Sequence, residues 1–103
     1  MEDRKNAFEN KYAHDAEVRF RAEARRNKLL GLWAAEKLGK TGEEGDAYVK
    51  EVIKSDFQEA GDDDVYRKLR ADFDAAGIDM SDHRIRRTME ELMIEAIRQI
   101  EGS

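Results

Sequence analysis

The chain of 103 residues has the length of a single domain, since domains typically occupy about 100–200 residues. Charged residues make up 42% of it, with acids and bases nearly balanced, which suits solvated helix faces better than a nucleic-acid binder. Cysteine is absent, which excludes disulfides and thiol catalysis, and no stretch approaches the ~20 apolar residues that cross a bilayer, so we expect a soluble, intracellular protein without direct membrane insertion.

Helix-forming residues dominate the sequence, proline is absent, and alternating β-branched or aromatic runs are almost missing. These features predict an all-α protein. Glycines at positions 39, 42, 45, 61 and 77 separate the stretches with helical apolar periodicity. Four helices are therefore expected.

The first predicted helix runs from about residue 6 to residue 38, and its two halves differ in apolar content. Its C-terminal end is densely apolar, from Leu29 through Leu32 to Leu38, and includes Trp33, which we interpret as a core anchor. Its N-terminal half buries too little to offset roughly 1–2 kcal/mol of backbone entropy per ordered residue, so we expect it to fray when alone. Phe8, Tyr12, Ala16 and Phe20 recur every fourth residue in this half, and the three aromatic ones among them are large.

Charged residues four positions apart support the same N-terminal half. Asp15 with Arg19 and Glu17 with Arg21 are favourable pairs, each contributing about 0.2–0.5 kcal/mol. His14 lies beside Asp15, and we interpret it as exposed or partner-facing. A second hypothesis makes His14 a proton switch, because an unperturbed imidazole titrates near pH ~6.5.

The second helix is predicted over residues 44–60, with apolar positions that extend to Phe57. Thr41 and Glu44 have the spacing of a capping box, in which each side chain bonds the backbone amide of the other residue. We therefore expect Thr41 to cap this helix.

The third helix begins after Gly61 with Asp62, Asp63 and Asp64, whose charges favour a helix N-terminus. Gly77 fits the left-handed residue that ends a helix in a Schellman motif, which places Ile78 against Phe73. The apolar positions expected to be buried are Val65, Leu69, Phe73 and Ala76.

The last helix has the clearest periodicity, with apolar residues at three- and four-residue steps from Ile85 to Ile100. These residues lie on one face, which we expect to be buried. Ser81 or Asp82 can cap its start.

Three sequence features suggest chemistry that their context does not support. Leu38 to Thr41 end like a phosphate-binding loop, but position 34 is alanine where that motif needs its first glycine, so we interpret them as a helix C-terminus and a turn. The acidic triplet at positions 62–64 lacks the glycine and glutamate of a calcium loop. His14 and His83 have no metal-ligand spacing, and no serine stands in a nucleophile elbow. We therefore expect no cofactor, no bound metal and no enzymatic activity.

Basic residues are concentrated at the N-terminal end. Residues 1–40 carry ten Lys/Arg and seven Asp/Glu, whereas residues 41–82 carry five and thirteen. The cluster at positions 25–28, Arg-Arg-Asn-Lys, is interpreted as a solvated face or a contact to an acidic protein surface rather than to nucleic acid.

Residues 11–17, Phe20 and residues 22–35 closely resemble the ATPase inhibitor zeta subunit of alphaproteobacterial F-type ATP synthases. Residues 55–59 and 61–68 continue the resemblance in register. The similarity covers most of the chain and weakens after about residue 78, where only the amphipathic helix persists.

This resemblance implies a four-helix bundle with a long, partly mobile N-terminal helix. Residues 1–20 would be a mobile inhibitory segment that becomes helical when bound, and residues 21–103 the bundle body. The segment would insert at the catalytic interface between α and β subunits, next to γ, and block ATP hydrolysis. The protein would be cytoplasmic and peripheral to the inner membrane through the ATP synthase head. The residues expected to bind these partners are Phe8, Lys11, Tyr12, His14, Glu17, Arg19, Phe20, Arg25, Arg26 and Asn27.

Two other classes of function stay open. A helical adaptor or regulator of a different enzyme would not bind the ATP synthase head. A nucleotide-sensing regulator, suggested by Gly39, Lys40 and Thr41, would change its amide chemical shifts on titration with ATP.

Overall fold

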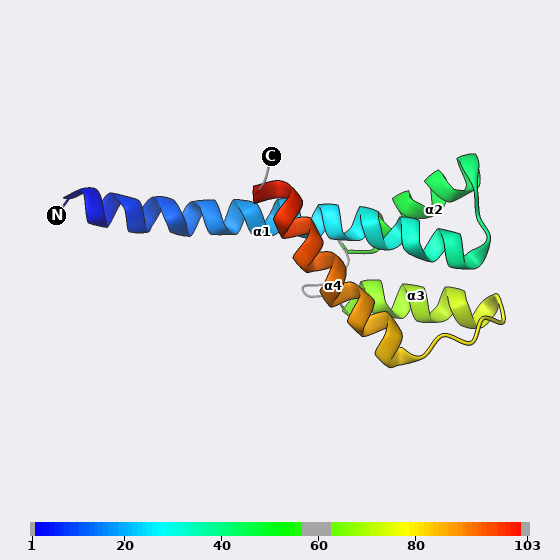
Figure 1. Cartoon of the computed structure of the whole chain (residues 1–103). Coiled ribbons are helices and arrows are strands. Elements are labelled where there is room, and N and C mark those ends of the chain that lie inside the picture. Colours follow the sequence, from blue (N-terminus) through cyan, green and yellow to red (C-terminus); the bar gives the residue numbers. More distant parts are fainter. Residues whose placement is uncertain (1, 57–62, 102–103) are drawn as a thin grey trace.

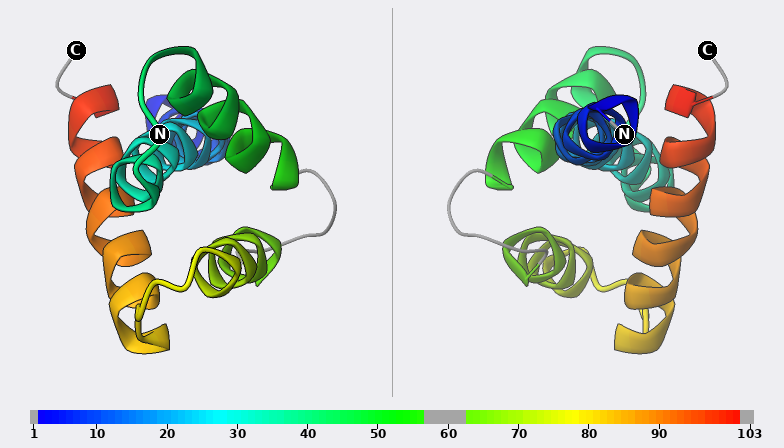
Figure 2. Two further views of the ribbon diagram at one scale, coloured as in Figure 1. Left: turned by 90° about the vertical axis from the view of Figure 1, so that its right-hand side faces the viewer. Right: turned by 90° about the vertical axis from the view of Figure 1, so that its left-hand side faces the viewer.

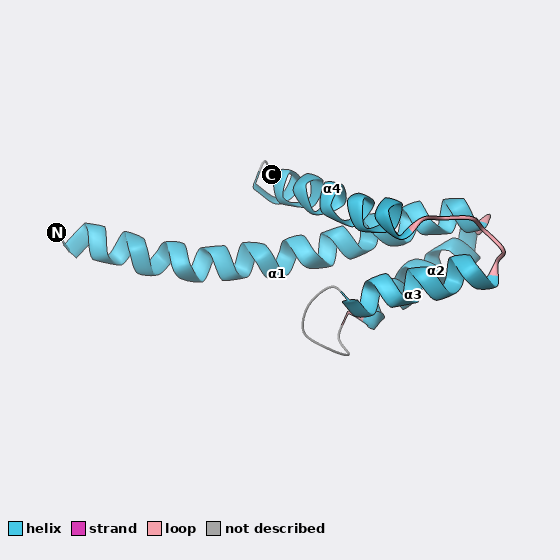
Figure 3. Cartoon of the chain, turned by 90° about the horizontal axis from the view of Figure 1, so that it is seen from below, coloured by secondary structure: helices cyan, strands magenta, loops and turns pink. Residues whose placement is uncertain are grey.

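The computed structural model of the chain describes residues 2–56 and 63–101, with side chains described from Glu17 onwards. Within these residues the chain forms four helices and no strand (Figure 1; Figure 3). The prediction of an all-α protein with four helices is confirmed. The helices are α1 (Glu2–Leu38), α2 (Gly42–Ser55), α3 (Asp63–Ala75) and α4 (Asp82–Glu101).

Helix α1 is the axis around which the other helices pack. Helix α2 lies along one side of α1 and α4 crosses its other side, while α3 contacts all three (Figure 2). The N-terminal half of α1 extends beyond the other helices, which makes the molecule 59 Å long and only 25 × 22 Å across (Figure 1).

The hydrophobic core collects side chains from all four helices. Leu30 of α1, Val52 of α2, Phe73 of α3 and Ile85 of α4 are each fully buried. Burying one side chain of this kind contributes about 1.5–3 kcal/mol. The rings of Trp33 and Phe73 meet edge to face with their centroids 5.7 Å apart, which confirms Trp33 as a core anchor.

Among the described residues, the apolar positions expected to be buried are buried or half-buried, apart from two that are exposed. Val65 and Leu69 of α3 are buried as expected, but Ala76 is exposed because α3 ends at Ala75 and the next residue lies in the turn. Leu32 is 48% exposed, since two residues along a helix turn it about 200° away from Leu30.

Gly31 is the one glycine inside the apolar part of α1, and close packing explains it. A Cβ atom at this position would lie 2.9 Å from the Cα of Val49, a distance shorter than real contacts. The two backbones therefore approach so closely that only glycine fits between α1 and α2.

Two helix ends follow the predicted motifs. Gly77 has a φ of 72°, Ile78 N–H donates to the Phe73 carbonyl at 2.9 Å, and Gly77 N–H donates to the Asp74 carbonyl at 3.0 Å. This pair of bonds is the Schellman motif that we predicted. At the start of α4, the Ser81 hydroxyl accepts a bond from the backbone N–H of Arg84 at 3.0 Å, so Ser81 is the cap.

Helix α2 differs from the prediction at both ends. Thr41 stands at the cap position but makes no side-chain cap bond, and Glu44 pairs instead with Lys40 at 3.3 Å, so the predicted capping box is wrong. Gly42, the first residue of α2, has a φ of 58°, so the chain enters the helix through a left-handed residue instead of a regular first turn. The helix ends at Ser55, and Phe57 with the rest of the expected C-terminal turn lies outside the described residues.

No helix in the described ranges is both long and apolar enough to cross a membrane.

Candidate functional site

The side chains of α1 next to the bundle divide into two faces. Ala22, Arg26 and Leu30 are buried and recur every fourth residue, so they form the face that packs on the body. No side chain from residue 17 to residue 21 is buried, and Phe20 is 66% exposed. The helix therefore leaves the bundle near Ala22 and carries an uncovered aromatic ring just beyond that point.

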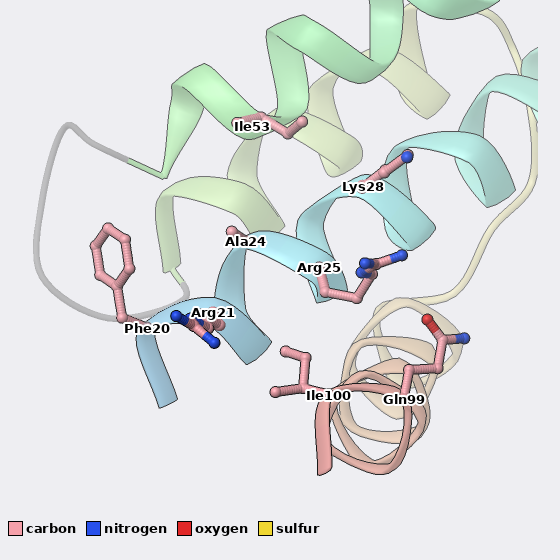
Figure 4. Close-up of a pocket in the computed structure, with 8 residues that line it drawn as sticks. All are labelled: Phe20, Arg21, Ala24, Arg25, Lys28, Ile53, Gln99 and Ile100. Carbon is pink, nitrogen blue, oxygen red and sulfur yellow. The ribbon is translucent and has the colours of Figure 1, made fainter. Parts of the chain in front are cut away.

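A groove of about 610 Å³ lies on the exposed face of α1, where the ends of α2 and α4 approach it (Figure 4). Arg21, Arg25 and Lys28 follow one another on α1 at four- and three-residue steps, so they share one side of the helix. Ile53 of α2 and Ile100 of α4 flank this row (Figure 4). The groove therefore combines positive charge with apolar walls. Its other lining residues are Phe20, Ala24 and Gln99.

The cations of this stretch differ in their ion pairing. Arg21 Nη2 lies 2.7 Å from Glu17 Oε1, which confirms the pair expected from their spacing. Arg19 Nε lies 3.3 Å from Glu23 Oε1. Arg25 and Lys28 have no carboxylate partner among the described residues, so their charges face solvent.

Only part of the basic cluster at positions 25–28 is exposed to solvent. This finding corrects our interpretation of the whole cluster as a solvated face. Arg26 and Asn27 are each 1% exposed. Arg26 Nε donates to Asn27 Oδ1 at 2.7 Å, and Asn27 Nδ2 donates to Asp56 Oδ2 at 2.8 Å, which ties α1 to the end of α2. The spacing Ala22, Arg26, Leu30 was the signal that could have placed Arg26 on the buried face.

Several residues expected to bind a partner lie on α1 before Glu17. The α1 backbone is helical through Phe8, Lys11, Tyr12 and His14, but their side chains lie outside the described residues. Of the remaining expected residues, Glu17, Arg19, Phe20 and Arg25 are exposed.

The segment that resembles a phosphate-binding loop is a helix end, as we interpreted it. Gly39 has a φ of 76° and Lys40 N–H donates to the Ala35 carbonyl at 2.8 Å, which closes α1. The Lys40 ammonium pairs with Glu44 and lies 5.9 Å from the ring centroid of Tyr48. A phosphate-binding loop follows a strand, whereas this segment follows α1 and joins it to α2, so it is no such loop.

The acidic start of α3 is neutralised by neighbouring arginines. Asp63 Oδ1 lies 3.0 Å from Arg86 of α4, and Asp64 Oδ1 lies 3.1 Å from Arg67 one turn on. Asp62 of the triplet lies outside the described residues. Elsewhere in the described ranges, no group of three or more His, Cys, Asp and Glu side chains is gathered as metal ligands would be.

A polar network joins α2 to α3. The Tyr48 hydroxyl donates to Asp72 Oδ2 at 2.7 Å, and Lys68 Nζ lies 3.1 Å from the same oxygen and 3.2 Å from Glu51 Oε1. Burial, and then the bond to Asp72, raise the pKa of the Tyr48 hydroxyl far above its usual range. Burial lowers the pKa of Lys68, but its bonds to Asp72 and Glu51 outweigh this effect and raise it overall.

A second network joins α3 to α4. Arg70 Nη2 lies 2.6 Å from Asp74 Oδ1, and its Nη1 lies 2.9 Å from Asp82 Oδ1. The Tyr66 hydroxyl bond, and then the bond from Arg70, hold the pKa of Asp82 below its ordinary value. The Arg86 guanidinium stacks 4.0 Å from the ring centroid of Tyr66. The charges of these two networks thus hold the helices of the body together, whereas Arg25 and Lys28 of the groove have no carboxylate partner among the described residues.

One comparison with known proteins identifies a family, and a second finds a similar solved structure. The model of the family described as ATPase inhibitor subunit zeta matches residues 1–99. A chain whose structure was solved by NMR in solution is 48% identical and superimposes with a TM-score of 0.72, and the match spans 82% of this chain and 96% of that one. No curated protein matches the sequence. Because the family model spans nearly the whole chain, this protein belongs to the ATPase inhibitor zeta subunit family.

Proposed function

We propose that the protein inhibits ATP hydrolysis by an F-type ATP synthase by inserting the N-terminal part of α1 at the catalytic interface between an α and a β subunit, next to γ. Membership of an ATPase inhibitor family supports a regulatory, non-catalytic role. The observation that carries the proposal is the extension of α1 beyond the other three helices (Figure 1). A helix that its own bundle leaves uncovered can dock in a cleft of another protein.

We place the boundary between an inhibitory segment and a body at the point where α1 leaves the bundle. Residues 1–20 form the inhibitory segment, and residues 21–103 form the body. The first buried side chain in the described part of α1 is Ala22, which supports a boundary near residue 20. A helical stretch with no buried face is only marginally stable in water, so we expect this segment to be mobile in the free protein and helical when bound.

The inhibitory segment contacts its partners through an aromatic row and the charges beside it. Inserting the row of Phe8, Tyr12 and Phe20 into a cleft buries the largest apolar surface that the segment offers. Arg26 and Asn27 are buried in the body, so we leave them out of the proposed contact. The contacts that we propose for the segment come from Phe8, Lys11, Tyr12, His14, Glu17, Arg19 and Phe20, and Arg25 of the body is a further contact to the same subunits.

The proposed binding to the ATP synthase head implies a subcellular location for the protein. The ATP synthase head stands on the cytoplasmic side of the inner membrane in the alphaproteobacterial enzymes that this family serves. The protein would therefore act in the cytoplasm as a peripheral component of that complex.

The test is ATP hydrolysis by the purified synthase head of the same organism, measured with increasing amounts of the full chain. We expect hydrolysis to fall to a small residual rate at saturation, because an inserted helix blocks rotation of γ. A rate unchanged by a large excess of the chain would refute the proposal and favour an adaptor of another enzyme.

A further inference from the structure

We infer that the groove formed by α1, α2 and α4 is a second contact surface, which binds an acidic segment with apolar side chains on the outside of an α or β subunit. This inference rests on the proposed function, and it adds residues of the body to the interface. Ile53 of α2 and Ile100 of α4, far apart in the sequence, belong to it (Figure 4).

The charge of the groove indicates an acidic occupant. Among the described residues, its lining contains Arg21, Arg25 and Lys28 and no acidic residue. Arg25 and Lys28 lack a carboxylate partner in the described part of the chain, so no described side chain neutralises their charges. Unpaired cations that share one face of a helix attract an acidic segment and raise its association rate.

The apolar side chains indicate that the occupant is not purely ionic. Ile53 and Ile100 flank the cationic row, and Phe20, which belongs to the inserted segment, lies at the N-terminal end of the groove. Apolar side chains beside arginine are the composition of an interface rather than of an ordinary solvated face. The occupant therefore needs apolar side chains between its acidic ones.

The position of the groove identifies the protein that carries this segment. The groove begins at Phe20, where the proposed inhibitory segment ends, and both lie on one continuous helix. A helix rises 1.5 Å per residue, so Arg25 lies about 20 Å along α1 from Tyr12. When Tyr12 is inside the cleft, the groove faces the outer rim of the subunits that form it.

The two contact surfaces make different contributions to inhibition. Insertion of the N-terminal segment blocks γ and so sets how completely hydrolysis stops. The groove holds the body against the head and so sets the concentration of protein that is needed. Loss of the groove should therefore raise the half-inhibitory concentration and leave the residual rate at saturation unchanged.

Charge reversal tests this separation in the full chain. We expect the double variant Arg25→Glu/Lys28→Glu to raise the half-inhibitory concentration at least tenfold and to weaken the salt dependence of inhibition. The matched control, Lys37→Glu/Arg84→Glu, reverses two exposed cations outside the groove and should stay within twofold of the native chain. A groove variant that inhibits like the native chain, or a control that loses as much, would overturn the inference.

The neutral variant Arg25→Gln/Lys28→Gln guards against a folding defect caused by the new acidic charges. We expect it to unfold at the native temperature and to raise the half-inhibitory concentration by a smaller factor than charge reversal. A neutral variant that unfolds normally and inhibits like the native chain would also overturn the inference.

Photo-crosslinking identifies the occupant directly. A benzophenone amino acid at position 53 should crosslink the full chain to an Asp/Glu-rich segment of an α or β subunit in the purified head. The same group at position 94, where Ile94 is 69% exposed on another face of α4, should not reach that segment. Crosslinks from position 53 to a second copy of the chain, or crosslinks from position 94 alone, would contradict the inference.

If the native chain does not inhibit at all, the proposed function itself fails, whereas inhibition without these effects rejects only the groove.

Discussion

The uncovered and the covered parts of α1 have the same secondary structure but different sources of stability. Residues 17–21 bury no side chain and are supported by exposed ion pairs such as Glu17 with Arg21, each contributing about 0.2–0.5 kcal/mol. From Ala22 onwards the same helix buries Leu30 and packs Gly31 against Val49. The described residues before Ala22 thus lack the core burial that stabilises the rest of the helix, and the predictions below test what this difference means.

Amide hydrogen exchange of the free protein should show the largest difference between the two regions. Amides of residues 2–20 should exchange within about tenfold of an unstructured chain, because a helix without a buried face opens readily. Amides of residues 85–100 should be protected by about 1,000-fold or more, since their exchange requires opening of the core. Equal protection of both stretches would show that the N-terminal half is held by contacts within the chain.

Truncating the aromatic row should separate inhibition from folding. Losing a buried aromatic anchor typically costs at least about 2 kcal/mol of binding, so Phe8→Ala or Tyr12→Ala should weaken inhibition at least tenfold. Thermal unfolding of the body should be unchanged, because its core begins at Ala22. The control variants are Glu90→Ala and Arg98→Ala, two exposed residues of α4. A comparable loss of inhibition in these controls would place the interface on α4.

The two halves of the basic cluster should respond differently to truncation. Asn27→Ala leaves the buried Arg26 and the Asp56 carboxylate without this partner, which should lower the free energy of unfolding by about 1–3 kcal/mol. Arg25→Ala, on the exposed side, should change it by no more than about 0.5 kcal/mol. Urea unfolding of both variants measures the difference. Equal effects would mean that the bond from α1 to Asp56 does not hold the body together.

Acid should weaken the α3–α4 junction by a smaller amount. The pKa of Asp82 is held below its ordinary value by Tyr66 and Arg70, so its contribution to stability is present above pH about 4 and is lost as pH falls through the lower folded pKa. Tyr66→Phe removes one of these bonds, so this variant should lose less stability than the native chain on acidification. Thermal unfolding between pH 2 and pH 6, the range around about 4 in which an aspartate titrates, compares the two proteins. Parallel curves would exclude this contribution.

Features encoded by neighbouring residues were predictable from the sequence alone. The buried face of α4 follows from the three- and four-residue spacing that begins at Ile85, and the end of α3 follows from Gly77 with Ile78. Backbone geometry within one or two turns determines both features, so the local sequence is sufficient to predict them.

Features that need two distant segments were decided only by the tertiary structure. The basic cluster reads as one solvated run, yet Asp56 of another helix end makes Asn27 and Arg26 part of the interior. The groove requires Ile53 and Ile100 to lie beside α1. The sequence around either residue gives no sign of this contact. Burial depends on which helices pack together, and packing joins residues that are separated by dozens of positions in the chain. The sequence alone determined the helices and their apolar faces, and the packing of α1 against α2 and α4 decided which of its charges remain available to a partner.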